Sequence, residues 1–276
     1  MPALAQVQAV ADSGWTLAAI HPGAVVGVAA LAGWYLWHAH RGAAHTPAPV
    51  GVPASGPGAP PRATPTVPQR VSFAAGLLVL LAALSGPLRD LSDRFLASAH
   101  MLQLLLLALV AAPLLLFGAP GWMLRPLLAR RPVAAVARVL TRPAAGFVSF
   151  SGAMIGWHLP VLHNLALAHP AVHALQHLTI LGTALLMWWP FLGSLEELPR
   201  LAYPGQMLYS FLLSLPVTLV AMSIVRAEDL LYPAYALAPR VWGLSPMTDQ
   251  DVAGIILGVP GVLFFYGVLS LSLIHI

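Results

Sequence analysis

The sequence contains no cysteine and no lysine, and charged residues make up only 8% of its 276 positions. The absence of cysteine excludes disulfides, zinc fingers, thiolate copper sites and cysteine-based redox chemistry. Soluble domains carry about 25% charged residues, so this chain has too few polar side chains to cover a globule in water. A soluble enzyme is therefore excluded, and any metal site must be built from histidine, methionine, aspartate or glutamate.

Apolar residues make up 59% of the chain, and its mean hydropathy is +0.81. About 20 apolar residues cross a hydrocarbon core of ~30 Å, and seven stretches have this length or nearly so. We therefore expect an all-α, polytopic membrane bundle of about seven transmembrane helices. The candidate spans are roughly Trp15–Trp37, Val71–Leu88, Ala97–Phe117, Ala144–Pro160, Ala171–Pro190, Gly205–Val225 and Val252–Leu271.

The chain divides into four regions. Residues 1–40 hold the first transmembrane helix, and residues 71–270 form a six-helix membrane domain. Residues 41–70, rich in proline, glycine and alanine, have almost no large apolar side chains, which predicts a disordered linker. Residues 271–276 match the translation of a widely used sequencing adapter and are expected to be an artefact. No cleavable signal peptide is expected, because the first apolar run is long enough to span the membrane.

The arginines predict the orientation. All 13 basic residues are arginine, and short cytoplasmic loops of membrane proteins are enriched in basic residues. With the N-terminus outside, nine arginines fall in inner loops and four in outer loops, so we expect N-out and C-in. Gly121–Arg142 carries five of the nine among apolar residues, which is typical of a basic helix on an anionic membrane face. No nucleic-acid partner is expected, because the arginines lie between spans.

Histidine is the conspicuous polar residue, with 11 copies. A histidine in or beside a span is costly unless it is paired, hydrated or bound to metal. His173 and His177 form the clearest pair, because positions i and i+4 share a helix face and two imidazoles there can reach one ion. The alternative is that both are solvated near lipid headgroups. Seven histidines are expected at the outer side: His21, His100, His158, His163, His169, His173 and His177.

Further candidate ligands begin or end other spans. His100 and Met101 begin the third, and imidazole with thioether suits copper, particularly Cu(I). Consecutive helical residues point about 100° apart, so both reach one ion only after local adjustment. His158 ends the fourth span, with His163 in the short turn that follows. The alternatives to metal binding are that Met101 packs against lipid or a neighbouring helix and that His158 caps its helix or contacts lipid headgroups. The predicted copper ligands are His100, Met101, His158, His163, His173 and His177.

Other polar residues have simpler interpretations. His169 and His21 each precede a proline and are expected at helix starts, while His38, His40 and His45 are expected to be solvated at the inner side. Asp249 is expected in the first turn of the last span, where an acidic side chain interacts favourably with the helix dipole. The alternative is that it orients a metal-bound histidine. No charged residue is expected at the middle of any span, which argues against an ion-coupled transporter.

Short motifs lie along roughly residues 71 to 261, each weakly specific alone. They are Leu91-Ser92-Asp93-Arg94-Phe95, Ala99-His100-Met101-Leu102-Gln103, Pro113-Leu114-Leu115, Phe117-Gly118-Ala119-Pro120, Trp157-His158-Leu159-Pro160, His169-Pro170 with His173 and His177, Trp188-Trp189-Pro190, Tyr232-Pro233 with Tyr235, Ser245-Pro246, Asp249-Gln250 and Val259-Pro260-Gly261. Together they resemble the caa3-type cytochrome c oxidase assembly factor family, often called CtaG. The family's third-span motif commonly reads His-Met-x-Gln-His, and here its last position is Leu104.

The resemblance implies a seven-span, non-enzymatic protein of the bacterial inner membrane that helps to assemble a haem–copper oxidase. Supplying copper to that oxidase is the usual proposal for the family. The implied partners are subunits of the cytochrome c oxidase and the lipid bilayer, and the implied cofactor is copper. Copper enters such an oxidase from the outer side, where the arginine count independently places the histidines. The lack of cysteine separates this chain from the unrelated, cysteine-containing copper chaperone of the same name.

Three alternatives remain open from the sequence. Histidine pairs on facing helices could ligate haem in a b-type membrane cytochrome. A metal permease is a weaker reading, because no polar pathway is expected at mid-membrane. A metal-free scaffold would use its histidines to contact headgroups or the oxidase.

Overall fold

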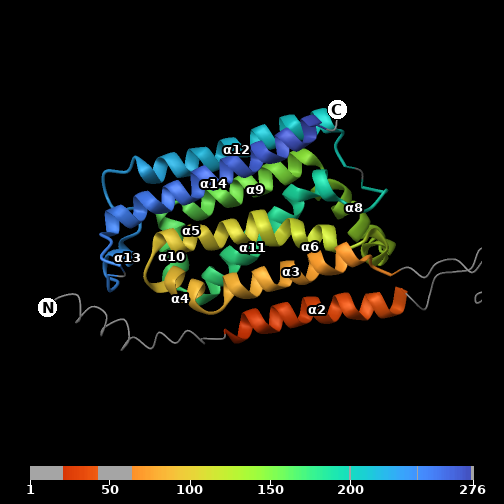
Figure 1. Ribbon diagram of the computed structural model, residues 1–276, viewed down its shortest axis with the longest axis horizontal. Helices are drawn as coiled ribbons and strands as arrows, with labels where there is room; N and C mark the ends of the chain where they lie inside the picture. Colours follow the sequence, from red (N-terminus) through yellow and green to blue (C-terminus); the bar gives the residue numbers. More distant parts are fainter. Residues whose placement is uncertain (1–20, 43–63, 199, 241, 275–276) are drawn as a thin grey trace, which may run out of the picture.

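The structure, a computed structural model, describes residues 21–42, 64–198, 200–240 and 242–274. Within these ranges the chain is helical, with no β-strand, which confirms the predicted all-α class. The long helices run side by side in alternating directions, and α2 lies along one edge of the bundle (Figure 1). The elements are α2 (Pro22–Gly42), α3 (Val67–Leu84), α4 (Pro87–Arg94), α5 (Ala97–Leu105), η1 (Leu106–Ala111), α6 (Ala112–Gly118), α7 (Gly121–Leu124), η2 (Arg125–Ala129), α8 (Arg131–Leu140), α9 (Pro143–His158), α10 (Pro160–Ala168), α11 (Pro170–Leu192), α12 (Tyr203–Val225), α13 (Pro233–Ala236) and α14 (Pro246–Ile274).

Several helices in the described part of the chain are long and apolar enough to cross a membrane, which confirms a polytopic helical bundle. A sixth candidate appears if α8 and α9, which meet at a bend of 73°, are taken as one broken span. The count of seven stays a prediction, because α9 alone has 16 residues and α2 is not among the candidates. The five single-helix candidates are Val67–Leu84, Ala97–Gly118, Pro170–Leu192, Tyr203–Val225 and Pro246–Ile274.

The second span differs from its expected bounds at both ends. The Thr66 side chain accepts a hydrogen bond from the backbone N–H of Gln69, and the Gln69 side chain accepts one from the backbone N–H of Thr66. This capping box starts α3 at Val67, inside the segment interpreted as a linker. At the other end Gly86, with φ 73°, turns the chain into the separate helix α4. Residues 43–63 of the expected linker and 15–20 of the expected first span lie outside the described residues.

The third span is a composite of α5, η1 and α6, in which a π-helical turn over Leu106–Ala111 precedes Pro113. Proline has no N–H to donate, and its ring clashes with the carbonyl four residues earlier. The wider π turn accommodates this local disruption. This span is also the most buried of the five candidates, so its polar side chains face other helices rather than lipid.

Two glycines bring helix backbones close together. A Cβ at Gly118 of α6 would lie 2.6 Å from the backbone nitrogen of Phe73 in α3. A Cβ at Gly254 of α14 would lie 2.5 Å from a methyl carbon of Val225 at the end of α12. Small residues at such positions let membrane helices approach closely, so α3–α6 and α12–α14 form tightly packed pairs.

Short helices α4, α10 and α13 cover one end of the bundle (Figure 1). The turn expected after the fourth span is instead the helix α10, which corrects the placement of His163. Pro160 disfavours the helical conformation at Leu159, which has φ −61° and ψ 132°. Pro160 itself suits the first position of a new helix. The chain therefore breaks at Leu159, restarts as α10 and carries His163 back toward the bundle.

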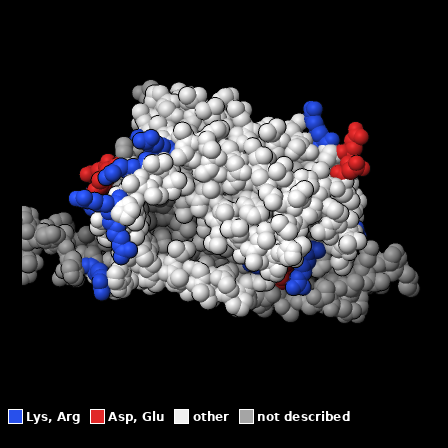
Figure 2. All heavy atoms as spheres, turned by 180° about the vertical axis from the view of Figure 1, so that it is seen from behind, with Lys and Arg blue, Asp and Glu red and all other residues white. Residues whose placement is uncertain are grey.

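The charged residues lie at the two ends of the bundle, and most arginines lie at the end opposite α10 (Figure 2). This arginine-rich end includes α7, η2 and α8, and there Arg125 Nε lies 2.9 Å from Glu197 Oε1. The structure therefore gathers at one end of the bundle the arginine-rich loops that the arginine count assigned to the inner side. Which end faces the cytoplasm stays a prediction.

Candidate metal centre

The first turn of α5 is held by a carboxylate from another helix. Leu96, at the N-cap position, has no side chain that can accept a hydrogen bond. Asp249 of α14 accepts hydrogen bonds from the backbone N–H groups of Ala97 (2.7 Å) and Ser98 (3.3 Å) and from the Ser98 hydroxyl (2.5 Å). A carboxylate at a helix N-terminus is favoured by the helix dipole. Asp249 thus holds the first turn of the helix that carries His100.

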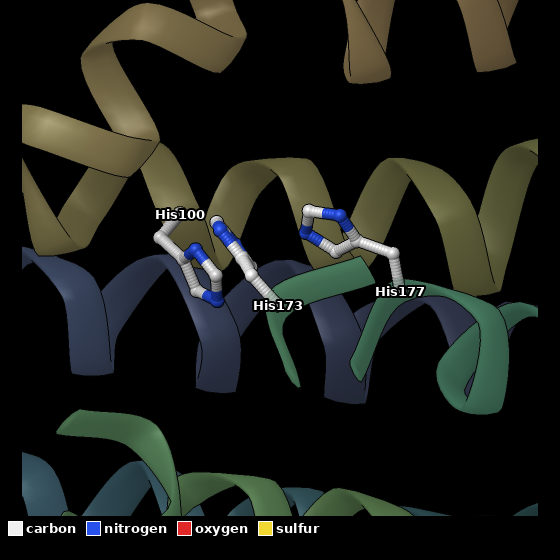
Figure 3. A group of neighbouring side chains, drawn as sticks. All are labelled: His100, His173 and His177. Atoms are coloured by element: carbon white, nitrogen blue, oxygen red, sulfur yellow. The ribbon is translucent and has the colours of Figure 1, made fainter. Parts of the chain in front are cut away.

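His100, His173 and His177 form a compact triangle in which one ligand nitrogen from each ring lies within 4.8 Å of the others. His173 and His177 project from α11 toward His100 of α5 (Figure 3). The ring centroids are 5.4 Å apart for His100–His173, 5.9 Å for His100–His177 and 4.5 Å for His173–His177. The i, i+4 pair therefore shares one helix face and meets a third imidazole, as the sequence predicted.

The triangle is buried and has unpartnered nitrogens. His100 is 0% exposed, and His173 and His177 are each 5% exposed. Within the described part of the chain, both ring nitrogens of His100 and the Nε2 atoms of His173 and His177 have no hydrogen-bond partner. A buried polar atom without a partner costs roughly 1–3 kcal/mol. A neutral imidazole has a proton on one nitrogen and a lone pair on the other, so an ion bound by one nitrogen of each ring would remove part of that cost, and the residues fit an ion.

His163 is a fourth imidazole at the same place. Its ring centroid lies 4.8 Å from that of His100, edge to face, and 4.1 Å from the ring of Tyr232. Burial, followed by the nearby imidazole of His158, lowers the pKa of His163 from 6.5 to about 3. The ring is therefore neutral at physiological pH and keeps a lone pair. Its nitrogens lie outside the set of three that can share one ion, so His163 borders the triangle.

Met101 and His158 form a separate pair on another face of α5. The Met101 sulfur lies 3.2 Å from His158 Nε2, and His158 Nδ1 lies 2.5 Å from the backbone oxygen of Met154. Both side chains are buried. The divergence of consecutive helical residues explains the split, because His100 faces α11 while Met101 faces the end of α9. The six predicted ligands thus divide into a triangle, its neighbour His163 and a nitrogen–sulfur pair.

A carboxylate stands beside the triangle. Asp93 Oδ1 lies 3.7 Å from His173 Nε2, and Asp93 Oδ2 lies 3.1 Å from Arg89 Nε. The Ser92 hydroxyl lies within hydrogen-bonding distance of Asp93 Oδ1 and of the buried Gln103 side chain. Carboxylates beside metal-binding histidines commonly fix the orientation of the ring. Asp93 is therefore placed to hold a proton on His173 Nε2, which would leave Nδ1 of that ring as the metal ligand.

Two tyrosines tie the end helices to this region. Tyr235 of α13 donates a hydrogen bond to the backbone oxygen of Ser92 (2.7 Å), and Tyr232 donates one to the backbone oxygen of His158 (3.0 Å). Burial, reinforced by the carboxylates of Asp93 and Asp249, raises the pKa of Tyr235 well above its usual range. Burial likewise raises the pKa of Tyr232. Both hydroxyls keep their protons and act as structural donors.

A cavity of about 330 Å³ borders one residue of the triangle, His177. His177 forms part of its wall, together with Arg89, Ala174 and residues at the start of α2. A water molecule takes about 30 Å³ of liquid volume, so this space is large enough for a hydrated ion. The buried triangle therefore borders, at His177, a cavity with room for an ion.

The remaining described histidines are not part of the triangle. His21 precedes α2, as expected, and its Nε2 is 3.6 Å from Asp90. His169 precedes α11 and is exposed, which suits the expected helix start. His38 and His40 lie at the opposite end of α2, where His38 Nδ1 contacts the Trp34 oxygen at 2.9 Å. His45 lies outside the described residues.

Gln176 of α11 is a buried polar residue that the sequence analysis did not single out. It is 0% exposed, and both polar atoms of its amide lack a hydrogen-bond partner among the described residues. The only signal was its place directly before His177.

The fold and site define a polytopic helical membrane protein with buried histidines gathered near one end of the bundle. The chain belongs to the Caa3_CtaG family, the cytochrome c oxidase caa3 assembly factors, whose family model matches residues 52–276. No curated protein and no solved structure matches the chain. The family match agrees with the resemblance carried by the short motifs.

Proposed function

We propose that this assembly factor binds copper through His100, His173 and His177 and supplies it to the caa3-type oxidase. The supporting observation is the triangle of buried imidazoles, whose ligand nitrogens lie within 4.8 Å of one another and include unpartnered atoms. A metal–imidazole bond is about 2 Å long, so two nitrogens on one ion lie at most about 4 Å apart. Small ring rotations would close the triangle around an ion.

The donor set and the family together favour copper. Imidazole binds copper, zinc, nickel and iron, and copper binds most tightly among the divalent ions of the series. The family's oxidase is a haem–copper enzyme, so copper is the cargo that an assembly factor would carry. We place the triangle at the extracytoplasmic side of the bacterial inner membrane, because the arginine-rich end of the bundle lies opposite.

The contact between the rings favours an ion over haem. A porphyrin held by two axial histidines separates their rings by the thickness of the macrocycle and needs a wide slot around them. Here the His173 and His177 rings are neighbours on one helix, 4.5 Å apart, and His100 packs against both. Three convergent imidazoles are the arrangement of a mononuclear metal site.

The proposal is tested in cells that make the caa3-type oxidase and depend on this chain. His173→Ala with His177→Ala should leave the protein in the membrane but yield an oxidase with little copper and little activity. The matched control is His169→Ala, which removes an exposed histidine at the start of the same helix. Normal copper content of the oxidase in the double variant would overturn the proposal and support a metal-free scaffold. A Soret band in the purified protein that the double variant abolishes would support haem instead.

A further inference from the structure

The pair formed by Met101 and His158 has an unusual arrangement of lone pairs. His158 Nδ1 lies 2.5 Å from the backbone oxygen of Met154, and a carbonyl oxygen only accepts hydrogen bonds. Nδ1 must therefore carry the proton. In the neutral ring the other nitrogen, Nε2, then presents a lone pair.

That lone pair faces a second lone-pair donor. The Met101 thioether sulfur, which has no proton to give, lies 3.2 Å from His158 Nε2. Met101 is 0% exposed and His158 5% exposed, so bulk water does not separate them. Two buried acceptors at this distance, with no donor between them, are stabilised when a cation binds both.

We propose that Met101 and His158 form a second copper site, selective for Cu(I), which receives the ion from the three-imidazole site. This inference rests on the proposed function of the triangle. With a metal–nitrogen bond of about 2.0 Å and a metal–sulfur bond of about 2.3 Å, the observed 3.2 Å separation corresponds to an angle of roughly 95° at the ion. That angle suits an ion that has one or two further ligands.

The thioether determines the selectivity. Soft sulfur ligands of methionine favour Cu(I) over harder divalent ions, whereas imidazole alone accepts zinc and Cu(II) as well. The triangle would therefore bind several metals, and the nitrogen–sulfur pair would pass on only reduced copper.

The two sites lie on neighbouring residues of α5. The Cα atoms of His100 and Met101 are about 3.8 Å apart, and their side chains leave the helix in different directions. His163, 4.8 Å from the His100 ring, borders the same region. Transfer is a ligand exchange without oxidation or reduction: Cu(I)–imidazole bonds of the triangle break as bonds to His158 Nε2 and Met101 sulfur form.

The test uses the full-length protein in detergent, loaded anaerobically with Cu(I), and reads copper content and X-ray absorption. Wild-type protein should bind about two equivalents and show copper–sulfur scattering. Met101→Leu keeps the volume but removes the sulfur, and it should lose one equivalent and the sulfur signal. His158→Asn keeps a donor for the Met154 oxygen without the Nε2 lone pair and should do the same. The control is Met123→Leu, which changes a buried methionine in α7, near the arginine-rich end.

The outcomes separate the two proposals. His173→Ala with His177→Ala should bind one equivalent and keep the sulfur signal. Wild-type protein with nitrogen ligands alone, or Met101→Leu with unchanged copper content and scattering, would overturn the second site and leave the triangle standing. Wild-type protein that binds no copper would overturn both. Circular dichroism at wild-type helicity establishes that each variant is folded.

Discussion

Asp249 and Ser98 are joined by two hydrogen bonds, one from the Ser98 hydroxyl and one from its backbone N–H to the same carboxylate oxygen. The carboxylate comes from α14 and caps α5, two residues before His100. This buried contact links the last span to the helix that carries His100 and Met101. The positions of both proposed copper ligands on α5 therefore depend on a residue outside the two proposed sites.

Asp249→Ala should lower both stability and copper affinity. Loss of a cap costs roughly 0.5–2 kcal/mol, and the stranded N–H groups of Ala97 and Ser98 add to that cost. Thermal unfolding in detergent, followed by circular dichroism, measures the first effect, and chelator competition the second. Asp251→Ala is the control, because Asp251 lies two residues on in the same helix and is partly exposed. Equal melting temperatures for the two variants would contradict the role of Asp249.

Asp93→Asn should weaken copper binding without abolishing it. The carboxylate lies 3.7 Å from His173 Nε2, and loss of such an outer partner typically costs about 10–100-fold in metal affinity. Titration against a chelator of known affinity gives the change, with copper stoichiometry unaltered. Glu197→Gln removes an exposed carboxylate at the other end of the bundle and should change nothing. An unaltered dissociation constant in Asp93→Asn would show that the carboxylate does not support the site.

Ala174→Trp should slow copper loading. Ala174 lines the cavity that reaches His177, and an indole there would fill part of the space. Because Ala174 is not a ligand, the equilibrium affinity should stay near that of the wild type. Stopped-flow quenching of tryptophan fluorescence measures the rate. Leu175→Trp, on an exposed face of the same helix outside the cavity, controls for the added fluorophore. Equal rates in the two variants would mean that copper takes another route.

The predicted orientation can be tested because the chain has no cysteine. Leu237, 91% exposed beside α13, and Val136, 57% exposed on α8, lie at opposite ends of the bundle. In intact spheroplasts a membrane-impermeant maleimide should label Leu237→Cys and leave Val136→Cys unlabelled until the membrane is opened. The reverse pattern would place the histidines in the cytoplasm and remove the proposed delivery route.

The sequence predicted what depends on composition and helical periodicity. Apolar runs located the long helices, and the spacing of His173 and His177 predicted that their rings share a face. The sequence could not predict that the six expected ligands divide into a triangle, His163 and the Met101–His158 pair. This division depends on how α5 is rotated about its axis relative to α9 and α11. Spacing along one helix contains no information on that rotation.

Other parts of the site required contacts between distant residues. Asp249 was expected to interact with the dipole of its own helix or to orient a metal-bound histidine, whereas its hydrogen-bond partners lie about 150 positions away in the chain. Pro160 indicated that the helix ends near this position. The contact between the His163 and His100 rings depends on tertiary packing, which the sequence does not show. Gln176 had no signal beyond its neighbour His177.

The central claim is that the buried imidazole triangle binds copper, and His100→Ala tests it most directly because His100 joins α5 to α11. Chelator competition with purified, folded protein should show copper affinity lowered by more than about 100-fold. Loss of a residue that only contacts a metal ligand already lowers metal affinity by about 10–100-fold, and loss of the ligand itself should have a larger effect. His169→Ala should match the wild type. Copper affinity in His100→Ala equal to that of His169→Ala would contradict the account.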